Sequence, residues 1–270
     1  MKNFTLITGA CGGLGKSFVK LCLKNKENLL LSGTSENKLF NLIEELRNDF
    51  SEDLSKIEIK TCVCDISSKN SRQNLIDFIS QNQICVNKLI NNAGLIIEGD
   101  LLRFEDDEIL KAIEVNCIGT LDLTQKIIKI RDKNQKLEIL TVASLAASYP
   151  IPHMAVYAAT KSFLVSMMTA LSVELKGENI VFSTVCPSGM ATTQAMKDSI
   201  ESMGLGGKIS TLPTDKVAKI ALKALKKRKA IVVPGVINKF VAAISKPFSF
   251  NFLAKITGKM WKKSQAKRKF

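Results

Sequence analysis

Residues 4–15 read FTLITGACGGLG, and this stretch decides the fold. The apolar run over residues 4–8 predicts a buried strand, and apolar positions recur at helical spacing after Gly15. Glycines between a strand and a helix permit a tight turn and let the backbone approach a phosphate, which then faces the free N–H groups of the helix. The G-x3-G-x-G spacing of Gly9, Gly13 and Gly15 therefore indicates a nucleotide-binding turn, with an ordinary glycine turn as the alternative.

The same alternation of apolar runs and helical patterns continues along the chain. Strands are predicted at 4–8, 28–33, 57–64, 86–91, 137–144, 180–187 and 230–233, and helices after Gly15 and at 36–50, 68–82, 104–130, 154–176 and 214–227. Most of the strands are continuous apolar runs, which is typical of parallel strands buried on both faces. The expected fold is α/β, a single-domain Rossmann-type doubly wound parallel sheet with helices on both faces over residues 1–234.

The composition is that of a globular protein. Hydrophobic residues make up 46% of the 270 and charged residues 24%, which argues against disorder. No run of 18 apolar residues occurs and the amino end lacks a signal-peptide pattern, so neither a membrane-spanning helix nor a leader is expected. The seven cysteines are scattered without a CxxC pair, so we expect reduced thiols in a cytoplasmic protein and no metal site.

Three polar residues in the second half of the chain point to catalysis. Tyr157 and Lys161 lie four apart in a predicted helix and share one face, where an ammonium group is expected to lower the pKa of a phenol. Ser144 ends a predicted strand, where its hydroxyl can bond a substrate carbonyl. Alone, such a Tyr and Lys indicate a solvated helix face. Behind a glycine turn and a strand-ending serine they indicate proton transfer to a substrate.

The order of these motifs resembles the short-chain dehydrogenase/reductase (SDR) family over residues 3–235. The resemblance rests on Thr8-Gly9-x3-Gly13-x-Gly15, Asp65, Asn91-Asn92-Ala93-Gly94, Asn116, Ser144, Tyr157-x3-Lys161 and Pro187-Ser188-Gly189-x2-Thr192. It implies an NAD(P)-dependent oxidoreductase acting on CH–OH or C=O groups. Tyr157 would exchange a proton with the substrate oxygen, and Lys161 would lower its pKa and bind the nicotinamide ribose. Ser144 would orient the carbonyl, and Asn116 would hold a water in the proton relay.

The resemblance also implies the dinucleotide-binding residues. Asp65 would contact the adenine, residues 92–94 would line the adenosine side, and residues 187–192 would hold the nicotinamide carboxamide. The whole expected set is Gly9, Cys11, Gly13, Leu14, Gly15, Thr34, Ser35, Asp65, Ile66, Asn92, Ala93, Gly94, Tyr157, Lys161, Pro187, Gly189 and Thr192. The chain departs from the family at Ser188, where glycine is usual, which bears on the loop geometry. Met190 replaces a smaller residue, which bears on the pocket shape.

Residues 32–35, at the end of the second predicted strand, favour NADP(H) over NAD(H). An acidic residue at this place would bind the ribose 2′-hydroxyl and repel a 2′-phosphate. Ser-Gly-Thr-Ser stands here instead, and Thr34 and Ser35 can donate hydrogen bonds to a phosphate. Glu36 is interpreted as the first turn of a helix that Ser35 caps. No basic residue lies inside the glycine turn, unlike many NADP-preferring members of the family.

The expected substrate site is apolar. Its residues are Ser144, Leu145, Tyr149, Met154 and Tyr157, with no Arg or Lys placed to hold a phosphate or carboxylate. This predicts a lipophilic ketone or alcohol, such as a ketoacyl, steroid-like or long-chain compound. Residues 190–212 would form a lid, and His153, the single histidine, is interpreted as a wall residue. The alternative to an enzyme is a non-catalytic dinucleotide sensor or a membrane-associated scaffold.

The charge is unevenly distributed along the chain. Residues 216–270 hold 16 Lys and Arg and no acidic residue, whereas residues 1–215 hold 23 basic and 25 acidic residues. We therefore treat 235–270 as a basic amphipathic C-terminal extension. It would attach peripherally to an anionic membrane or pack on the domain or a second subunit. A homo-oligomer, dimer or tetramer, is expected, and binding to nucleic acid is not.

Overall fold

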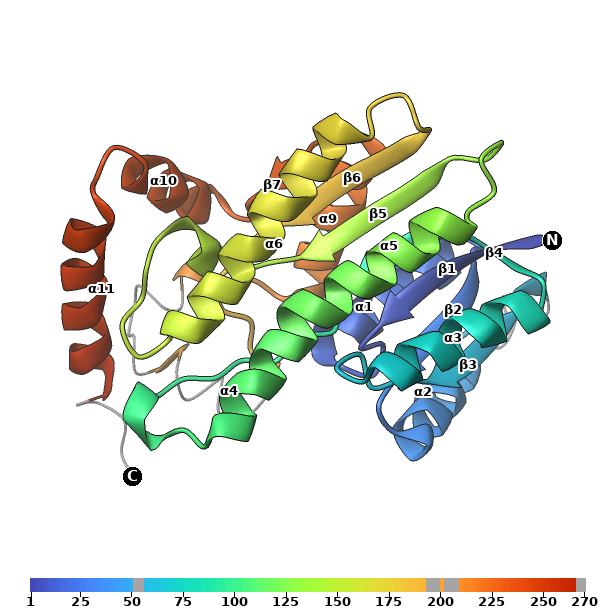
Figure 1. Ribbon diagram of the computed structural model, residues 1–270, viewed down its shortest axis with the longest axis horizontal. Coiled ribbons are helices and arrows are strands. Elements are labelled where there is room, and N and C mark those ends of the chain that lie inside the picture. Colours follow the sequence, from blue (N-terminus) through green and yellow to red (C-terminus); the bar gives the residue numbers. More distant parts are fainter. Residues whose placement is uncertain (51–55, 193–199, 202–208, 266–270) are drawn as a thin grey trace.

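A computed structural model describes the backbone of residues 1–50, 56–192, 200–201 and 209–265. Its centre is a seven-stranded sheet in the order β3-β2-β1-β4-β5-β6-β7 (Figure 1), in which every pair of neighbours is parallel. The strands are β1 Lys2–Thr8, β2 Asn28–Gly33, β3 Ile59–Val63, β4 Ile84–Asn91, β5 Leu137–Val142, β6 Ile180–Val185 and β7 Ile231–Val232. The order reverses beside β1, so the carboxyl ends of β1 and β4 border the crevice where such sheets bind ligands. The predicted doubly wound parallel sheet is confirmed.

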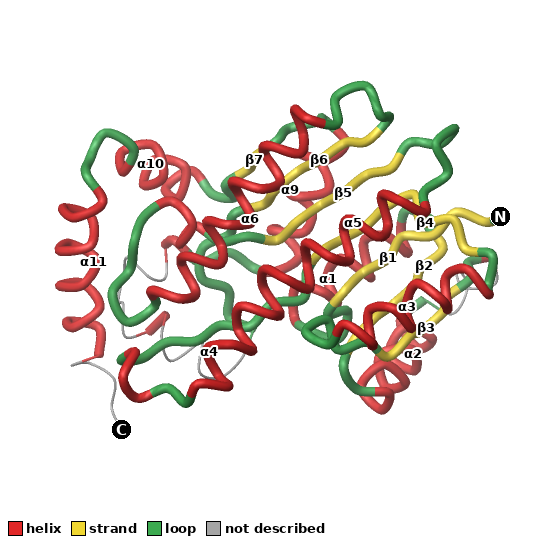
Figure 2. Tube along the Cα trace, viewed as in Figure 1, coloured by secondary structure: helices red, strands yellow, loops and turns green. Residues whose placement is uncertain are grey.

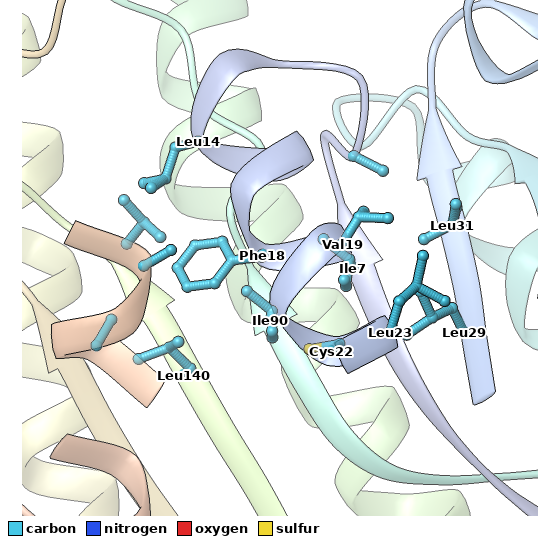
Figure 3. Close-up of a cluster of buried hydrophobic side chains, with 14 of the residues drawn as sticks. Ile7, Leu14, Phe18, Val19, Cys22, Leu23, Leu29, Leu31, Ile90 and Leu140 are labelled. Atoms are coloured by element: carbon cyan, nitrogen blue, oxygen red, sulfur yellow. The ribbon is translucent and has the colours of Figure 1, made fainter. Parts of the chain in front are cut away.

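Helices cover both faces of this sheet. On one face α1 (Gly13–Lys24), α2 (Glu36–Asp49) and α9 (Thr214–Lys226) pack their apolar sides into a core centred on Phe18 (Figure 3). On the other face α3 (Lys69–Gln81), α5 (Thr120–Ile130) and α6 (Ala155–Glu174) enclose a second core. The central strands are apolar toward both cores, which is why their sequences read as continuous apolar runs rather than alternating ones.

The single helix predicted over residues 104–130 is interrupted. A 3-10 turn, η2 (Leu101–Arg103), comes first, and α4 (Asp106–Ile113) then begins with a capping box between Glu105 and Glu108. A π-helical segment, η3 (Glu114–Gly119), joins α4 to α5. At Gly119 a Cβ atom would lie 2.3 Å from the carbonyl oxygen of Ile66, so only glycine lets the helix pass this close to the preceding strand end.

The described part of the C-terminal extension folds into two helices. Helix α10 spans Val236–Ser245 and α11 spans Phe250–Gln265, with Pro247 between them. Both lie at the end of the molecule opposite the amino terminus (Figure 2). Most of the predicted lid, residues 193–199 and 202–208, lies outside the described residues.

One described helix, α6, is long and apolar enough to cross a membrane by length and composition, although the sequence predicted no such helix. Thr160, Lys161 and Ser162 interrupt it, which is why no unbroken apolar run marks it. It packs against β6 and the 3-10 turn η4 (Leu145–Ser148). We therefore interpret α6 as a core helix of the domain.

Candidate active site

The glycine turn after β1 is built from close backbone contacts. Gly9 has a φ of +61°, a left-handed conformation that favours glycine, and the N–H of Gly12 donates to its carbonyl oxygen. A Cβ atom on Gly15 would lie 2.2 Å from that same oxygen, so the first turn of α1 could not form over the loop with any other residue. Gly15 therefore lets the helix pack closely on the strand–turn unit.

The end of β4 fastens this turn in place. The Asn92 side chain donates to the carbonyl oxygens of Thr8 (2.9 Å) and Gly9 (3.0 Å). The Thr8 hydroxyl in turn accepts from the backbone N–H groups of Asn92 and Ala93. Through these hydrogen bonds the Asn92 side chain fixes the shape of the turn, a positioning role that the sequence did not predict.

The amino end of α1 suits a pyrophosphate. Gly12 caps the helix, the first turn holds no acidic residue, and a Cβ atom on Gly13 would lie only 2.8 Å from the methyl group of Thr192. Thr192, a predicted cofactor-binding residue that is distant in sequence from the glycine turn, therefore lies directly against it. These bare, closely approachable backbone positions fit a dinucleotide phosphate at a helix amino end. Leu14 is buried, so its part in such a site is through the backbone.

Cys11 is no reactive thiol in this turn. Burial raises its pKa and outweighs the nearby Lys16 and Lys38, which lower it. A thiol that stays protonated packs as a small side chain in this turn.

The end of β2 is arranged as predicted for the helix that follows. The Ser35 hydroxyl accepts from the backbone N–H of Lys38 and caps α2, and Glu36 lies in the first turn of that helix. Thr34 is exposed beside it, and no acidic residue occupies positions 32–35.

At the end of β3, Asp65 is held by neighbouring side chains. Its carboxylate accepts from the backbone N–H and hydroxyl of Ser67, and the Lys111 ammonium lies 2.7 Å away. Although burial raises the pKa of Asp65, these hydrogen bonds lower it overall, so the carboxylate is charged at neutral pH. Ile66, also predicted for the cofactor, is buried in the second core. Lys111 was not predicted, because nothing in its own spacing marks it.

The catalytic candidates come together where β5 and α6 meet. The Ser144 hydroxyl lies near that of Tyr157 and lowers its pKa, and it accepts from the backbone N–H of Ala146, which fixes it at the start of η4. The Lys161 ammonium lies 5.8 Å from the Tyr157 ring centre and donates to the carbonyl oxygen of Val142. Tyr157 and Lys161 do share one face of α6, and both are buried.

The predicted lowering of the pKa of Tyr157 is wrong for this structure. Burial raises the pKa of Tyr157, and the neighbouring Ser144 hydroxyl only partly offsets the rise. Burial also lowers the pKa of Lys161 to about 8, so the ammonium stays the main form of Lys161 at pH 7. The sequence could place the ammonium beside the phenol, but not the desolvation that acts on both groups.

Asn116 is fully buried in the π-helical segment. Its amide donates to Leu95 O (2.8 Å) and to Thr160 Oγ1 (3.0 Å), and its carbonyl accepts from Leu95 N–H. A Cβ atom on Gly94 would lie 3.1 Å from the Lys161 ammonium and 3.3 Å from the Asn116 oxygen. The backbone at Gly94 therefore passes directly over both predicted groups. The proposed water relay stays a prediction.

Thr160 contacts the predicted catalytic residues, but the sequence did not predict a role for it. Its hydroxyl donates to the backbone carbonyl of Tyr157 and accepts from Asn116, so one side chain links the two predicted catalytic elements. Its position just before Lys161 in the Tyr-x3-Lys motif is the only sequence signal for it.

The loop after β6 is joined to the residue that follows Ser144. The carbonyl oxygen of Pro187 accepts from the N–H of Leu145, at 2.7 Å. Ser188 has no positive φ, so its replacement of glycine leaves this loop unstrained. Gly189 lies against Ile200 and Thr211.

Two of the predicted substrate residues are largely buried, Leu145 in η4 and Tyr149 after it, and burial raises the pKa of Tyr149. Met154 is partly buried and packs on the cluster that contains Tyr157. A separate apolar hollow of about 290 Å³ is lined by Ile113, Cys117, Val156, Ala159 and Thr160, which are not the predicted substrate residues. The apolar character predicted for the substrate set is present, whereas its role stays a prediction.

Helix α11 covers the loop between Ser144 and Tyr157. The Trp261 ring stacks on His153 at 3.7 Å, and its indole N–H donates to Glu98. The Thr257 hydroxyl donates to the carbonyl oxygen of Pro150. His153 has a φ of +65° and its Nδ1 lies 2.7 Å from Asp100. The interpretation of His153 as a wall residue missed its stacking partner Trp261, which lies 108 residues further along the chain.

Comparisons with known proteins agree with this geometry. The family model described as short chain dehydrogenase matches residues 3–203. The chain is 33% identical over 182 residues to a very-long-chain 3-oxoacyl-CoA reductase of Neurospora crassa, covering 66% of this chain and 53% of that protein. It is 30% identical over 183 residues to a 3-oxoacyl-[acyl-carrier-protein] reductase of Rickettsia conorii, covering 68% and 70%. The match thus spans about half the length of the Neurospora relative.

A solved structure of a 7β-hydroxysteroid dehydrogenase is similar in fold. It has a TM-score of 0.80 over 94% of this chain and 96% of that chain, at 20% identity.

Proposed function

Because this chain belongs to the short-chain dehydrogenase family, we propose that it is an NAD(P)-dependent oxidoreductase that reduces the ketone of a 3-oxoacyl thioester. The relatives named above are 3-oxoacyl reductases by name, and the predicted substrate residues here are apolar apart from the Ser144 and Tyr157 hydroxyls and that of Tyr149. The observation that carries the proposal is the group formed by buried Tyr157, Lys161 and Asn116 together with the partly buried Ser144. A non-catalytic sensor would not need this group, so we do not favour that alternative.

The residues of the group have separable tasks. The Tyr157 hydroxyl donates its proton to the ketone oxygen as charge builds on it, and its raised pKa keeps that proton in place at neutral pH. Ser144, held by Ala146 N–H, positions the same oxygen. The nicotinamide supplies the hydride when bound. The phosphates of the dinucleotide would lie at the amino end of α1, over Gly9, Gly13 and Thr192.

We further propose NADP(H) as the preferred dinucleotide. Support comes from the exposed Thr34 and the lack of an acidic residue at positions 32–35, where a carboxylate would repel a 2′-phosphate. A cytoplasmic location is supported by the seven cysteines, all of which are free. A homo-oligomer is supported by apolar side chains exposed along α4, η3 and α5, among them Leu110, Ile118 and Leu121.

The assay follows the loss of reduced nicotinamide in the purified full chain. It compares NADPH with NADH on 3-oxoacyl thioesters of increasing chain length, with bulky ketones and steroids as competing classes. Tyr157→Phe should lower kcat/KM by about a thousandfold, because the proton donor is lost. Dinucleotide affinity and Tm of this variant should stay near those of the wild type. Retained turnover in Tyr157→Phe would refute the proposed chemistry.

A further inference from the structure

Helix α10 is inverted relative to a normal surface helix. Its buried residues are polar, Asn238 and Ser245. Its exposed residues are large and apolar: Val236, Ile237, Phe240, Val241 and Ile244, with Val236 83% and Phe240 65% exposed. A soluble surface helix places its apolar side toward the core, so this helix presents its adhesive side to the outside.

Polar contacts hold α10 in this orientation. The Asn238 amide donates to the carbonyl oxygens of Ser210 and Pro234, both within 3 Å. The Ser245 hydroxyl donates to Ala242 O within the helix. Gly235, with a φ of +92°, begins the helix, and a Cβ atom there would lie 2.9 Å from the Asn238 amide. Because the inner side is fixed by hydrogen bonds, the apolar side cannot turn inward without breaking them.

Helix α11 likewise has one side packed on the domain and an apolar side that is exposed. Its inner side, formed by Leu253, Thr257, Gly258 and Trp261, packs on the loop at residues 150–153 and on Glu98. Its outer side exposes Phe252, Ile256 and Met260. These three and the five exposed apolar residues of α10 are called the α10–α11 surface.

Lysines lie around this surface, and no acidic residue of α10 or α11 accompanies them. Within residues 236–263 they are Lys239, Lys246, Lys255, Lys259, Lys262 and Lys263, all exposed. Neither α10 nor α11 contains an acidic residue, and none occurs anywhere after Asp215. An apolar surface edged by lysines matches the headgroup boundary of an anionic bilayer, where the side-chain stems bury and the ammonium groups meet phosphates.

We propose that the α10–α11 surface docks this protein on an anionic lipid bilayer. Charge decides between a bilayer and a second copy of the chain. A two-fold contact would place this surface against itself, so lysines would face lysines with no acidic residue of α10 or α11 to pair with them. With 10 residues α10 is too short to span a bilayer, so the helix lies along the interface.

The position of the surface links docking to the candidate active site. Helix α11 covers the loop that runs from Ser144 to Tyr157, so a docked molecule would hold that loop close to the lipid. An apolar substrate could then pass from the bilayer to the site. This link rests on the proposed function, whereas docking itself does not, and vesicle binding is measured without substrate or dinucleotide.

The test is flotation of the full chain with vesicles of phosphatidylcholine, with and without phosphatidylglycerol. The wild type should float with the anionic vesicles and bind the neutral ones at least about tenfold more weakly. Phe240→Ser should lower the partition coefficient about tenfold. Its matched control is Phe40→Ser on α2, because Phe40 is 62% exposed and likewise lies on a helix.

A second pair of variants isolates the charge. Lys259→Glu with Lys263→Glu changes the α10–α11 surface, and Lys219→Glu with Lys223→Glu makes the same change on α9. The first pair should abolish binding to anionic vesicles, and the second should leave most of it. Equal losses in both pairs, or a wild type that stays in solution with both kinds of vesicle, would overturn the proposal. So would a dimer that Phe240→Ser splits into monomers without any vesicle binding.

Discussion

Helices α6 and α10 are both apolar helices with polar residues on their buried sides, but they use those residues differently. In α6 the buried Tyr157 and Lys161 have few partners in the described chain, and burial shifts the pKa of each. In α10 the buried Asn238 donates both of its amide hydrogens to backbone carbonyls. The Asn238 Oδ1 atom has no partner among the described residues, so only the donor side of this amide is satisfied. Buried polar groups with shifted pKa values indicate chemistry, whereas an uncharged amide that donates to backbone carbonyls indicates attachment.

Beyond Tyr157→Phe, the largest effect is expected at Lys161. Lys161→Met should lower kcat/KM at least about a hundredfold, because the ammonium beside Tyr157 is lost. The same variant should be more stable at pH 7, since a buried charge is removed. The pKa of Lys161 is about 8 in the folded chain against 10.5 ordinarily, so the unfolded chain binds more protons between these values. Wild-type stability should therefore rise from pH 8 to about 10.5.

Urea unfolding of both proteins at pH 7 and above pH 10 checks this prediction. The advantage of Lys161→Met should be about 3 kcal/mol at pH 7 and should largely vanish at the higher pH. Groups other than Lys161 titrate in both proteins and cancel in the difference. A difference independent of pH would show that Lys161 is not a buried titrating group.

A smaller effect is expected at Asn238. Asn238→Leu leaves the carbonyl oxygens of Ser210 and Pro234 without this donor, which should cost about 1–3 kcal/mol of unfolding free energy. Amide hydrogens of α10 and α11 should exchange faster than those of α6. Asn70→Leu, at an exposed position of α3, is the control and should change stability by less than about 0.5 kcal/mol. Equal exchange rates in α6 and in the α10 and α11 helices would contradict the anchoring role of Asn238.

The smallest effect is expected at His153. His153→Asn keeps a residue that tolerates the left-handed backbone but removes the ring stacked on Trp261. Stability should fall by about 1 kcal/mol or less. Because Trp261 is the single tryptophan, its fluorescence reports the surroundings of this one ring, and its emission maximum should move to longer wavelength when the stack is lost. Phe40→Ser should leave the emission unchanged, and an unaltered spectrum in His153→Asn would mean that the stack does not form in solution.

Much of the fold could be predicted because parallel strands buried on both faces leave continuous apolar runs. The site residues follow strand ends or lie at helical spacing, so Ser144, Tyr157 and Lys161 could be identified from the sequence. The π-helical segment could not, because it adds a single residue to a helical pattern and lies where Gly119 approaches Ile66, a residue distant in sequence.

Two further features depend on contacts distant in sequence. The pKa of Tyr157 follows from burial, which no local pattern encodes. Helix α11 was not predicted, because lysines interrupt its apolar residues and its partner His153 lies far away in the chain. Only the folded chain shows which side of it is covered.

The covering of residues 150–153 by α11 also has a consequence for anyone who engineers this protein. Cutting the chain at residue 234, the predicted end of the catalytic domain, would strip Trp261 and Thr257 from the segment that leads to Tyr157. Such a shortened enzyme would lose activity for reasons unrelated to lipid. A fusion partner or affinity handle belongs ahead of β1, at the opposite pole of the molecule (Figure 1).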